Sequence, residues 1–249
     1  MSIIAVAGKG GTGKTTLSAL IIRALLNRGS KPILAIDADP NANLAESLGI
    51  KHEESIGSVL SDFLRGRDSL PAGVTKQAYL EMKLHQILHE GRDIDLLVMG
   101  VPEGPGCYCA ANAMLRDYFE RLAGNYPFVV VDNEAGMEHF SRKTAAVIDT
   151  LILCTAYSLK GLRTASILSG MADRLGITIA RRYLLINRAP DRLSSAFEEA
   201  VQETGIPLLG AIPNDPAIEE AELAGRSLLD LPGDAPAVKR AFELVQHFT

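Results

Sequence analysis

The strongest constraint on the fold comes from residues 8–16, which read Gly-Lys-Gly-Gly-Thr-Gly-Lys-Thr-Thr. An apolar run at 3–7 precedes this segment, and apolar residues at helical spacing follow it at 17–25. A strand, a glycine-rich loop and a helix in this order form the setting of a phosphate-binding loop. The glycines let backbone N–H groups converge on phosphate oxygens, and the helix N-terminus adds its dipole and free N–H groups. The segment therefore predicts an α/β protein that binds a phosphate chain.

The polar side chains of this loop have separate expected roles. Lys14 can reach the β- and γ-phosphates of a nucleotide, and the Thr15 hydroxyl can bind Mg²⁺. Lys9 stands too early to duplicate Lys14. It is either a solvated surface lysine or a lysine that reaches the nucleotide of a second copy of the chain. Nucleotide contacts are expected from Gly10, Gly11, Thr12, Gly13, Lys14, Thr15 and Thr16.

Apolar runs alternate with amphipathic segments along the whole chain, which predicts a mostly parallel sheet of seven to eight strands with helices on both faces. Expected strands lie at 2–7, 32–37, 94–99, 127–132, 150–155, 182–187 and 207–212. Expected helices lie at 14–28, 43–49, 56–65, 75–90, 110–124, 138–148, 160–175, 193–204, 215–224 and 235–247. We expect one domain over 1–249, with a helical insertion at 50–92 that carries His52, His85 and His89.

Acidic residues end two of the expected strands. The second strand leads into Asp37-Ala38-Asp39-Pro40, and the fourth ends in three valines followed by Asp132. In open α/β sheets, ligands bind at the carboxyl ends of strands. Asp132 follows the Walker B pattern and is expected to hold Mg²⁺, directly or through water. Asp37 and Asp39 suit a metal-bound water and the orientation of an attacking water, with a simple turn as the alternative.

Two later strand ends fit a nucleobase. Asn187 ends one expected strand, and an amide there can pair with the edge of adenine. Pro213 and Asp215 follow the next strand in a rigid turn that can line a base pocket. Each is also an ordinary strand-end turn when taken alone. No N-K-x-D motif is present, which disfavours guanine.

The pair Cys107 and Cys109 can turn two thiols toward one point. Two thiolates are too few for a four-coordinate Zn²⁺ or Ni²⁺ site, but two chains related by a two-fold axis would supply four. Two reduced cysteines of no special role are the alternative. The third cysteine, Cys154, lies inside an expected strand and is most simply a small core residue.

The stretch after Asp132 continues to Gly136, Glu138 and His139. A glycine there would let the loop approach the γ-phosphate and respond to hydrolysis. Glu138 and His139 are either a catalytic or metal-handling pair, or a helix-start acid beside a partly exposed histidine.

Charge and hydropathy limit the partners. The net charge of −5 gives no strong attraction to nucleic acid. No apolar stretch reaches the roughly 18 residues of a membrane-spanning helix, and the N-terminus lacks signal-peptide features, so we expect a cytoplasmic protein. The tail 238–248 is amphipathic but holds only two basic residues, which favours a packed terminal helix over a membrane anchor.

Taken together, residues 8–15, Asp37 to Pro40, Asp132 and Asn187 resemble the deviant Walker A ATPases, the SIMIBI-class P-loop NTPases that include MinD, ParA and the nitrogenase iron protein. The resemblance covers nearly the whole chain. It implies a homodimer with ATP between the subunits. Lys9 then resembles the signature lysine that crosses to the partner's nucleotide, Asp39 the switch I residue that places the attacking water, and Asp132 with Gly136 part of switch II.

The Cys-x-Cys pair and the stretch 132–139 are similar to the CooC-type nickel-insertion ATPases of carbon monoxide dehydrogenase maturation and to AcsF-type factors for acetyl-CoA synthase. The resemblance implies that Cys107 and Cys109 of two subunits bind Ni²⁺ or Zn²⁺ at the dimer interface. It also implies ATP or ADP with Mg²⁺ as cofactors, and an apo-enzyme as client. The alternative is a MinD- or ParA-type positioning ATPase that dimerises on membrane or DNA.

Overall fold

The computed structural model describes residues 1–65, 73–101, 109–134 and 147–248. Its seven strands form one sheet in the order β3-β2-β4-β1-β5-β6-β7, and every neighbouring pair is parallel. The strands are β1 (Ser2–Ala7), β2 (Ile33–Ala38), β3 (Ile94–Val98), β4 (Phe128–Asn133), β5 (Val147–Ala156), β6 (Thr178–Ala189) and β7 (Leu208–Pro213). The predicted α/β fold with a parallel sheet is confirmed.

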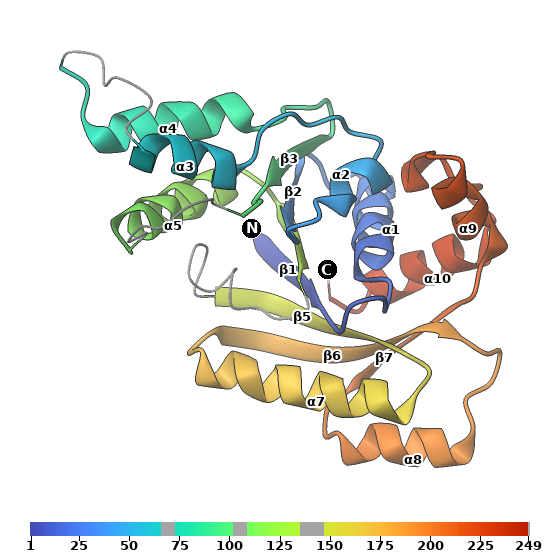
Figure 1. Ribbon diagram of the computed structural model, residues 1–249. Coiled ribbons are helices and arrows are strands. Elements are labelled where there is room, and N and C mark those ends of the chain that lie inside the picture. Colours follow the sequence, from blue (N-terminus) through green and yellow to red (C-terminus); the bar gives the residue numbers. More distant parts are fainter. Residues whose placement is uncertain (66–72, 102–108, 135–146, 249) are drawn as a thin grey trace.

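Helices cover both faces of the sheet (Figure 1). One face carries α1 (Lys14–Asn27), α2 (Asn43–Ser47), α9 (Pro216–Leu223), the 3₁₀ helix η1 (Leu228–Asp230) and α10 (Pro236–Val245). The other carries α3 (Ile56–Arg65), α4 (Lys76–Ile87), α5 (Cys109–Ala123), α7 (Leu159–Arg174) and α8 (Ser195–Glu203). Within the described ranges, no helix combines the length and apolarity needed to cross a bilayer.

The central strand β1 shows why the strand sequences are apolar at nearly every position. Ile3, Ala5 and Ala7 pack into the core under α3, α5 and α7, whereas Ile4 and Val6 pack into the core under α1 and α10. Successive side chains of a strand point to opposite faces, so a strand with a core on each face is apolar at every position.

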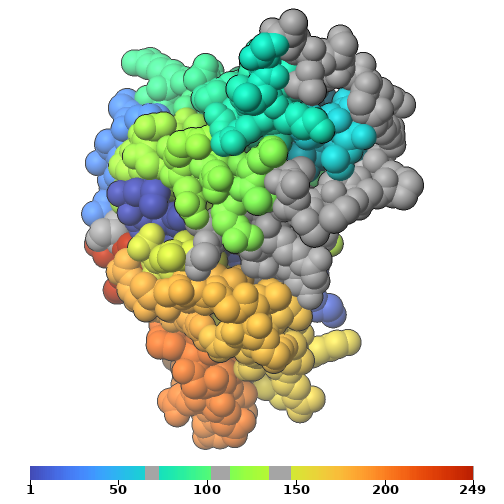
Figure 2. Space-filling view, turned by 90° about the vertical axis from the view of Figure 1, so that its left-hand side faces the viewer, coloured from blue at the N-terminus to red at the C-terminus, as the bar shows by residue number. Residues whose placement is uncertain are grey.

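The described residues of the segment 50–92 include the helices α3 and α4, which lie side by side (Figure 1). Figure 2 shows the same arrangement from the side, with the α3–α5 layer in cyan to green above the yellow and orange region of α7 and α8. Of the histidines in the segment 50–92, His85 packs edge-on against Tyr118 of α5, with ring centroids 5.4 Å apart.

The expected helix at 138–148 is wrong at its C-terminal end. Residues 138–146 lie outside the described part of the chain, but Val147 and Ile148 begin β5 and pair with Thr178 and Ile179 of β6. Their β-branched side chains favour a strand. Strand β6 also starts at Thr178, before the expected start at 182. The residues 178–181 are exposed or partly exposed and include the polar Thr178 and Arg181, so they do not form a continuous apolar run.

Candidate functional site

The phosphate-loop segment connects the end of β1 to the first turn of α1. Gly11 and Gly13 have φ angles of 78° and 83°, a left-handed conformation that favours glycine. A side-chain carbon on Gly8 would collide with the backbone carbonyl of Cys154, and one on Gly13 would collide with Nδ2 of Asn187. Gly13 is therefore required by its backbone conformation and also by its close contact with β6.

Thr12 makes hydrogen bonds both within the loop and to the neighbouring strands β5 and β6. Its backbone N–H and its hydroxyl both donate to the carbonyl of Lys9, at 3.3 and 2.8 Å. Its own carbonyl accepts from Nδ2 of Asn187 at 2.9 Å and from Sγ of Cys154 at 3.4 Å. Within the described residues, no group accepts from the backbone N–H of Gly13 or Lys14. Free N–H groups at a helix N-terminus form an anion-binding site.

Lys14 and Lys9 occupy different environments. The Lys14 side chain is buried, and among the described residues no oxygen accepts a hydrogen bond from its ammonium. A buried ammonium without hydrogen-bond acceptors is costly even near the Asp132 charge, so a bound phosphate would stabilise this lysine. Lys9, by contrast, is exposed. Its contact with the nucleotide of a second chain stays a prediction.

Two buried carboxylates lie beside the loop. Asp37 of β2 and Asp132 of β4 are partners in the parallel register, and both side chains are fully buried. Asp132 accepts from the hydroxyls of Thr15 at 2.6 Å and Ser18 at 3.2 Å. The strand order thus brings together the three predicted magnesium ligands, Thr15, Asp37 and Asp132.

The electrostatics of this pair suit a cation. Burial, with a smaller contribution from the nearby Asp132, raises the pKa of Asp37 to about 7 against the lowering effect of the Leu44 hydrogen bond. Burial likewise raises the pKa of Asp132 to about 6, against the lowering effects of the Thr15 hydrogen bond and the Lys14 charge. Carboxylate and hydroxyl oxygens are the hard ligands that Mg²⁺ prefers, and its charge would offset their desolvation. The donor set therefore fits Mg²⁺.

Asp39 lies next to this cluster but faces another way. Its backbone N–H donates to Asp37 at 3.1 Å. Its carboxylate accepts from the backbone N–H and the side-chain amide of Asn41, at 3.0 and 2.9 Å. This is the turn that the sequence offered as the alternative, so a water-orienting Asp39 would have to exchange its contacts with Asn41 for contacts with water.

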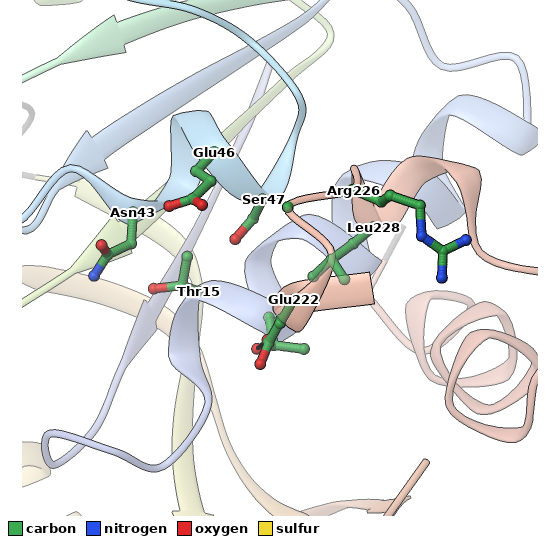
Figure 3. Close-up of a pocket in the computed structure, with 9 residues that line it drawn as sticks. Thr15, Asn43, Glu46, Ser47, Glu222, Arg226 and Leu228 are labelled. Atoms are coloured by element: carbon green, nitrogen blue, oxygen red, sulfur yellow. Dashed lines mark hydrogen bonds between the residues drawn. The ribbon is translucent and has the colours of Figure 1, made fainter. Parts of the chain in front are cut away.

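A cavity of about 290 Å³ opens beside the first turn of α1 (Figure 3). Asn43, Glu46 and Ser47 of α2 form one wall and Glu222 of α9 another, while the Arg226 side chain points away from Thr15. A second cavity of only about 20 Å³ lies on the other side of Glu222. Its lining residues are Thr16, Asn187, Arg188, Pro213, Asn214, Asp215, Ile218, Glu219 and Glu222.

Glu222 is the residue that sequence reasoning missed. Its carboxylate accepts from the hydroxyl of Thr16 at 3.0 Å, and this contact separates the two cavities. In the sequence Glu222 is one acid among several on an amphipathic helix. Only its position on the helix that starts directly after the Pro213–Asp215 turn relates it to the base site.

The predicted base-site residues do come together in the smaller cavity, but they have structural contacts of their own. The Asp215 carboxylate accepts from the N–H groups of Ala217 and Ala237, at 3.0 and 2.9 Å, and so caps the first turns of both α9 and α10. The NH₂ group of Asn187 donates a hydrogen bond to the Thr12 carbonyl of the phosphate loop. At about 20 Å³ the cavity is too small for a purine, so base binding would require these side chains to move apart.

Of the two predicted nickel ligands, only Cys109 lies in the described part of the chain. Cys107 lies outside the described residues, as do Gly136, Glu138 and His139, and Cys109 is the first residue of α5. In the described ranges, no three histidine, cysteine, aspartate or glutamate side chains cluster so that they could hold a metal ion. Cys154 is buried, and burial raises the pKa of its thiol to about 12, as expected for a core cysteine.

Comparisons with known proteins bear on this site. The family model described as the CobQ/CobB/MinD/ParA nucleotide binding domain matches residues 3–228. The chain is 40% identical to an uncharacterized ATP-binding protein of Methanocaldococcus jannaschii, over 98% of this chain and 97% of that protein. It is 33% identical to the carbon monoxide dehydrogenase accessory protein CooC of Rhodospirillum rubrum, over 92% of this chain and 89% of that one.

Solved structures show the same fold. The MinD cell division protein of Aquifex aeolicus matches with a TM-score of 0.70 and 23% identity, over 99% of this chain and 96% of that chain. MinD of Pyrococcus horikoshii, complexed with Mg-ADP, matches with a TM-score of 0.68 and 22% identity, over 99% and 95%. The family match spans most of the sequence, so the chain belongs to the CobQ/CobB/MinD/ParA family of nucleotide-binding proteins and is an ATPase of the MinD/ParA type.

Proposed function

We propose that the protein is an ATP-hydrolysing metallochaperone that carries Ni²⁺ between Cys107 and Cys109 of two subunits and assists nickel insertion into carbon monoxide dehydrogenase. The likeness to the accessory protein CooC, at 33% identity over 92% of the chain, carries this proposal. The Cys-x-Cys pair supports it, because Cys109 begins α5 and two copies of the pair supply the four thiolates of a metal site. Acetyl-CoA synthase is the other client with matching chemistry.

The nucleotide site would operate by positioning and charge neutralisation. Free N–H groups of the loop and the ammonium of Lys14 bind the phosphate chain. Thr15, Asp37 and Asp132 would hold Mg²⁺, and the bound ion would neutralise negative charge on the phosphates. The exposed position of Lys9 suits contact with the nucleotide of a partner subunit.

The remaining assigned residues act at the two ends of the nucleotide. Asp39 is proposed to orient the water that attacks the γ-phosphate. Asn187, Pro213 and Asp215 are proposed to hold adenine in the smaller cavity. ATP binding would close the homodimer and reshape the four-thiolate site, and hydrolysis would reset it. Metal affinity and nucleotide state are then coupled through one dimer equilibrium.

Anaerobic titration of the reduced protein with Ni²⁺, with and without ATP, tests this proposal when bound metal and mass are measured together. We expect half an equivalent of nickel per chain, with dimerisation. Replacing Cys107 and Cys109 with alanine should abolish nickel binding and leave ATP binding intact. Lys14→Ala is the reciprocal control, because it should abolish ATP turnover and leave the thiols in place. No nickel uptake by the wild type would reject the metallochaperone.

A MinD- or ParA-type positioning ATPase is the second candidate. The fold is the same in both classes of protein and does not distinguish this candidate from a metallochaperone. One observation weighs against a membrane role for the last helix. The apolar residues of α10, among them Val238, Leu244 and Val245, are buried in the core shared with α1 and β7. ATP-dependent binding to anionic vesicles or to duplex DNA, without nickel uptake, would favour this candidate.

A further inference from the structure

The side chain of Asn187 lies between the phosphate loop and the smaller cavity. Asn187 is the last residue of the continuous buried run 184–187 of β6, and the next residue, Arg188, is exposed and has a left-handed φ of 52°. The pairing of β6 with β7 is irregular between Ile186 and Ala189. A left-handed residue other than glycine is strained, and such strain persists only where the surroundings hold it. The backbone at this strand end is therefore fixed in an unusual conformation directly beside the loop.

The amide orientation of Asn187 follows from chemistry. Its neighbour is the carbonyl oxygen of Thr12, which can only accept, so the group 2.9 Å away must be the NH₂. The oxygen Oδ1 is then left for the cavity that Asn187 lines, and in the described part of the chain no group donates to it. One amide thus presents a donor to the phosphate loop and an acceptor to the base site.

The contact with Thr12 acts on the phosphate-binding groups. The peptide between Thr12 and Gly13 is planar and trans, so its carbonyl and its N–H point in opposite directions. Holding the Thr12 carbonyl against Asn187 therefore holds the Gly13 N–H on the side away from β6. Within the described residues that N–H has no acceptor, so it remains available to a phosphate oxygen. Gly13 also permits the contact, since any side chain there would collide with Asn187.

We propose that Asn187 is a positioning residue for the phosphate loop, which it holds in its phosphate-binding conformation through the carbonyl of Thr12. A contact with the base alone would make Asn187 matter only for ligands that carry a base. The loop contact makes it matter for a bare phosphate chain as well. The inference rests on the proposed assignment of this loop to phosphate binding.

Calorimetric titration with Mg²⁺–tripolyphosphate, which has no base, and with Mg–ATP separates the two roles. We expect Asn187→Ala to weaken tripolyphosphate binding by about three- to tenfold, the effect of one lost hydrogen bond. ATP binding should weaken by more. Asn187→Ser is measured in parallel, because its short hydroxyl also loses the hydrogen bond to the Thr12 carbonyl, which among the described residues keeps only the Cys154 thiol as a donor. It gives a second test if alanine impairs folding. Thermal unfolding of each variant verifies the fold.

Asn214→Ala is the matched control, because Asn214 lines the same cavity and, among the described residues, makes no hydrogen bond to the loop residues 8–16. It should bind tripolyphosphate with wild-type affinity. Wild-type tripolyphosphate affinity in the folded Asn187 variants, with only ATP binding weakened, would overturn the inference. If wild-type protein bound ATP and Lys14→Ala bound it equally well, the phosphate-loop assignment itself would fall, and the inference with it.

Discussion

Replacing Asp37 with asparagine is expected to stabilise the metal-free protein while abolishing ATP hydrolysis. Burial raises the pKa of Asp37 from 3.8 to about 7, which corresponds to about 4 kcal/mol of destabilisation once the carboxylate is charged. Asparagine removes the charge but can no longer accept from both Leu44 and Asp39, a loss of about 1 kcal/mol. We expect the free energy of unfolding at pH 8 to rise by about 2 to 3 kcal/mol.

The pH dependence of this gain has a defined sign. An acid with a higher pKa in the folded state binds protons more tightly when folded, so wild-type stability falls as the pH rises from about 4 to about 7. The advantage of Asp37→Asn should therefore shrink by about 2 to 3 kcal/mol between pH 8 and pH 5. Asp132 titrates in the same direction in both proteins. Because the two carboxylates repel each other, the pKa of Asp132 is lower in the variant, which adds to the gain in stability at high pH.

Urea unfolding in the presence of EDTA at pH 5 and pH 8 measures the effect. Asp234→Asn serves as the control, because Asp234 is exposed and its replacement should leave the pH dependence unchanged. A stability difference between Asp37→Asn and the wild type that stays constant across this pH range would refute the reasoning. Undiminished ATP turnover in Asp37→Asn would refute the magnesium assignment.

Three further outcomes are expected. Gly13→Ala should abolish nucleotide binding and lower the free energy of unfolding by about 2 to 4 kcal/mol, because its new side chain collides with Asn187 and its φ is left-handed. Gly29→Ala is the control, since Gly29 is also left-handed but lies in open space. This variant should lower the free energy of unfolding by only about 1 kcal/mol and retain nucleotide binding. Cys154 should resist iodoacetamide at pH 8 until the protein unfolds, as mass spectrometry of the digested protein would show, since burial raises its thiol pKa to about 12. Tyr126→Phe removes a hydroxyl that donates to a buried carboxylate of β3 and should cost about 1 to 3 kcal/mol in urea unfolding without changing ATP turnover.

Local patterns predicted the phosphate loop and most strands, because both depend on neighbouring residues. The apolar run before Gly8 and the helical pattern after Lys14 define the strand, loop and helix without any distant contact. The carboxyl-end position of Asp37 and Asp132 also follows from the sequence. Their contact as register partners does not, since it requires β2 to lie beside β4 rather than only beside β3.

The contacts that sequence reasoning missed join residues far apart in the chain. Asn187 reaches Thr12 across 175 positions, and Glu222 reaches Thr16 across 206. Nothing in the spacing of a strand-end asparagine indicates that its amide faces the phosphate loop. The start of β5 at Val147 was missed for a different reason. Two β-branched residues favour a strand, but so short a run directly after an amphipathic stretch does not interrupt the helical pattern of that stretch.

The site combines charges that the folded chain does not balance by itself. Lys14 is a buried cation without a hydrogen-bond acceptor in the described residues, while burial raises the pKa values of two neighbouring carboxyl groups. Asp37 also accepts from the N–H of Leu44, so its charge acts on the first turn of α2. Because α2 lines the larger cavity, we expect cation binding at Asp37 to be coupled to the shape of that cavity. A Mg–nucleotide relieves both imbalances at once, so it should stabilise the wild type more than Asp37→Asn, and equal stabilisation of the two in thermal unfolding would contradict this coupling.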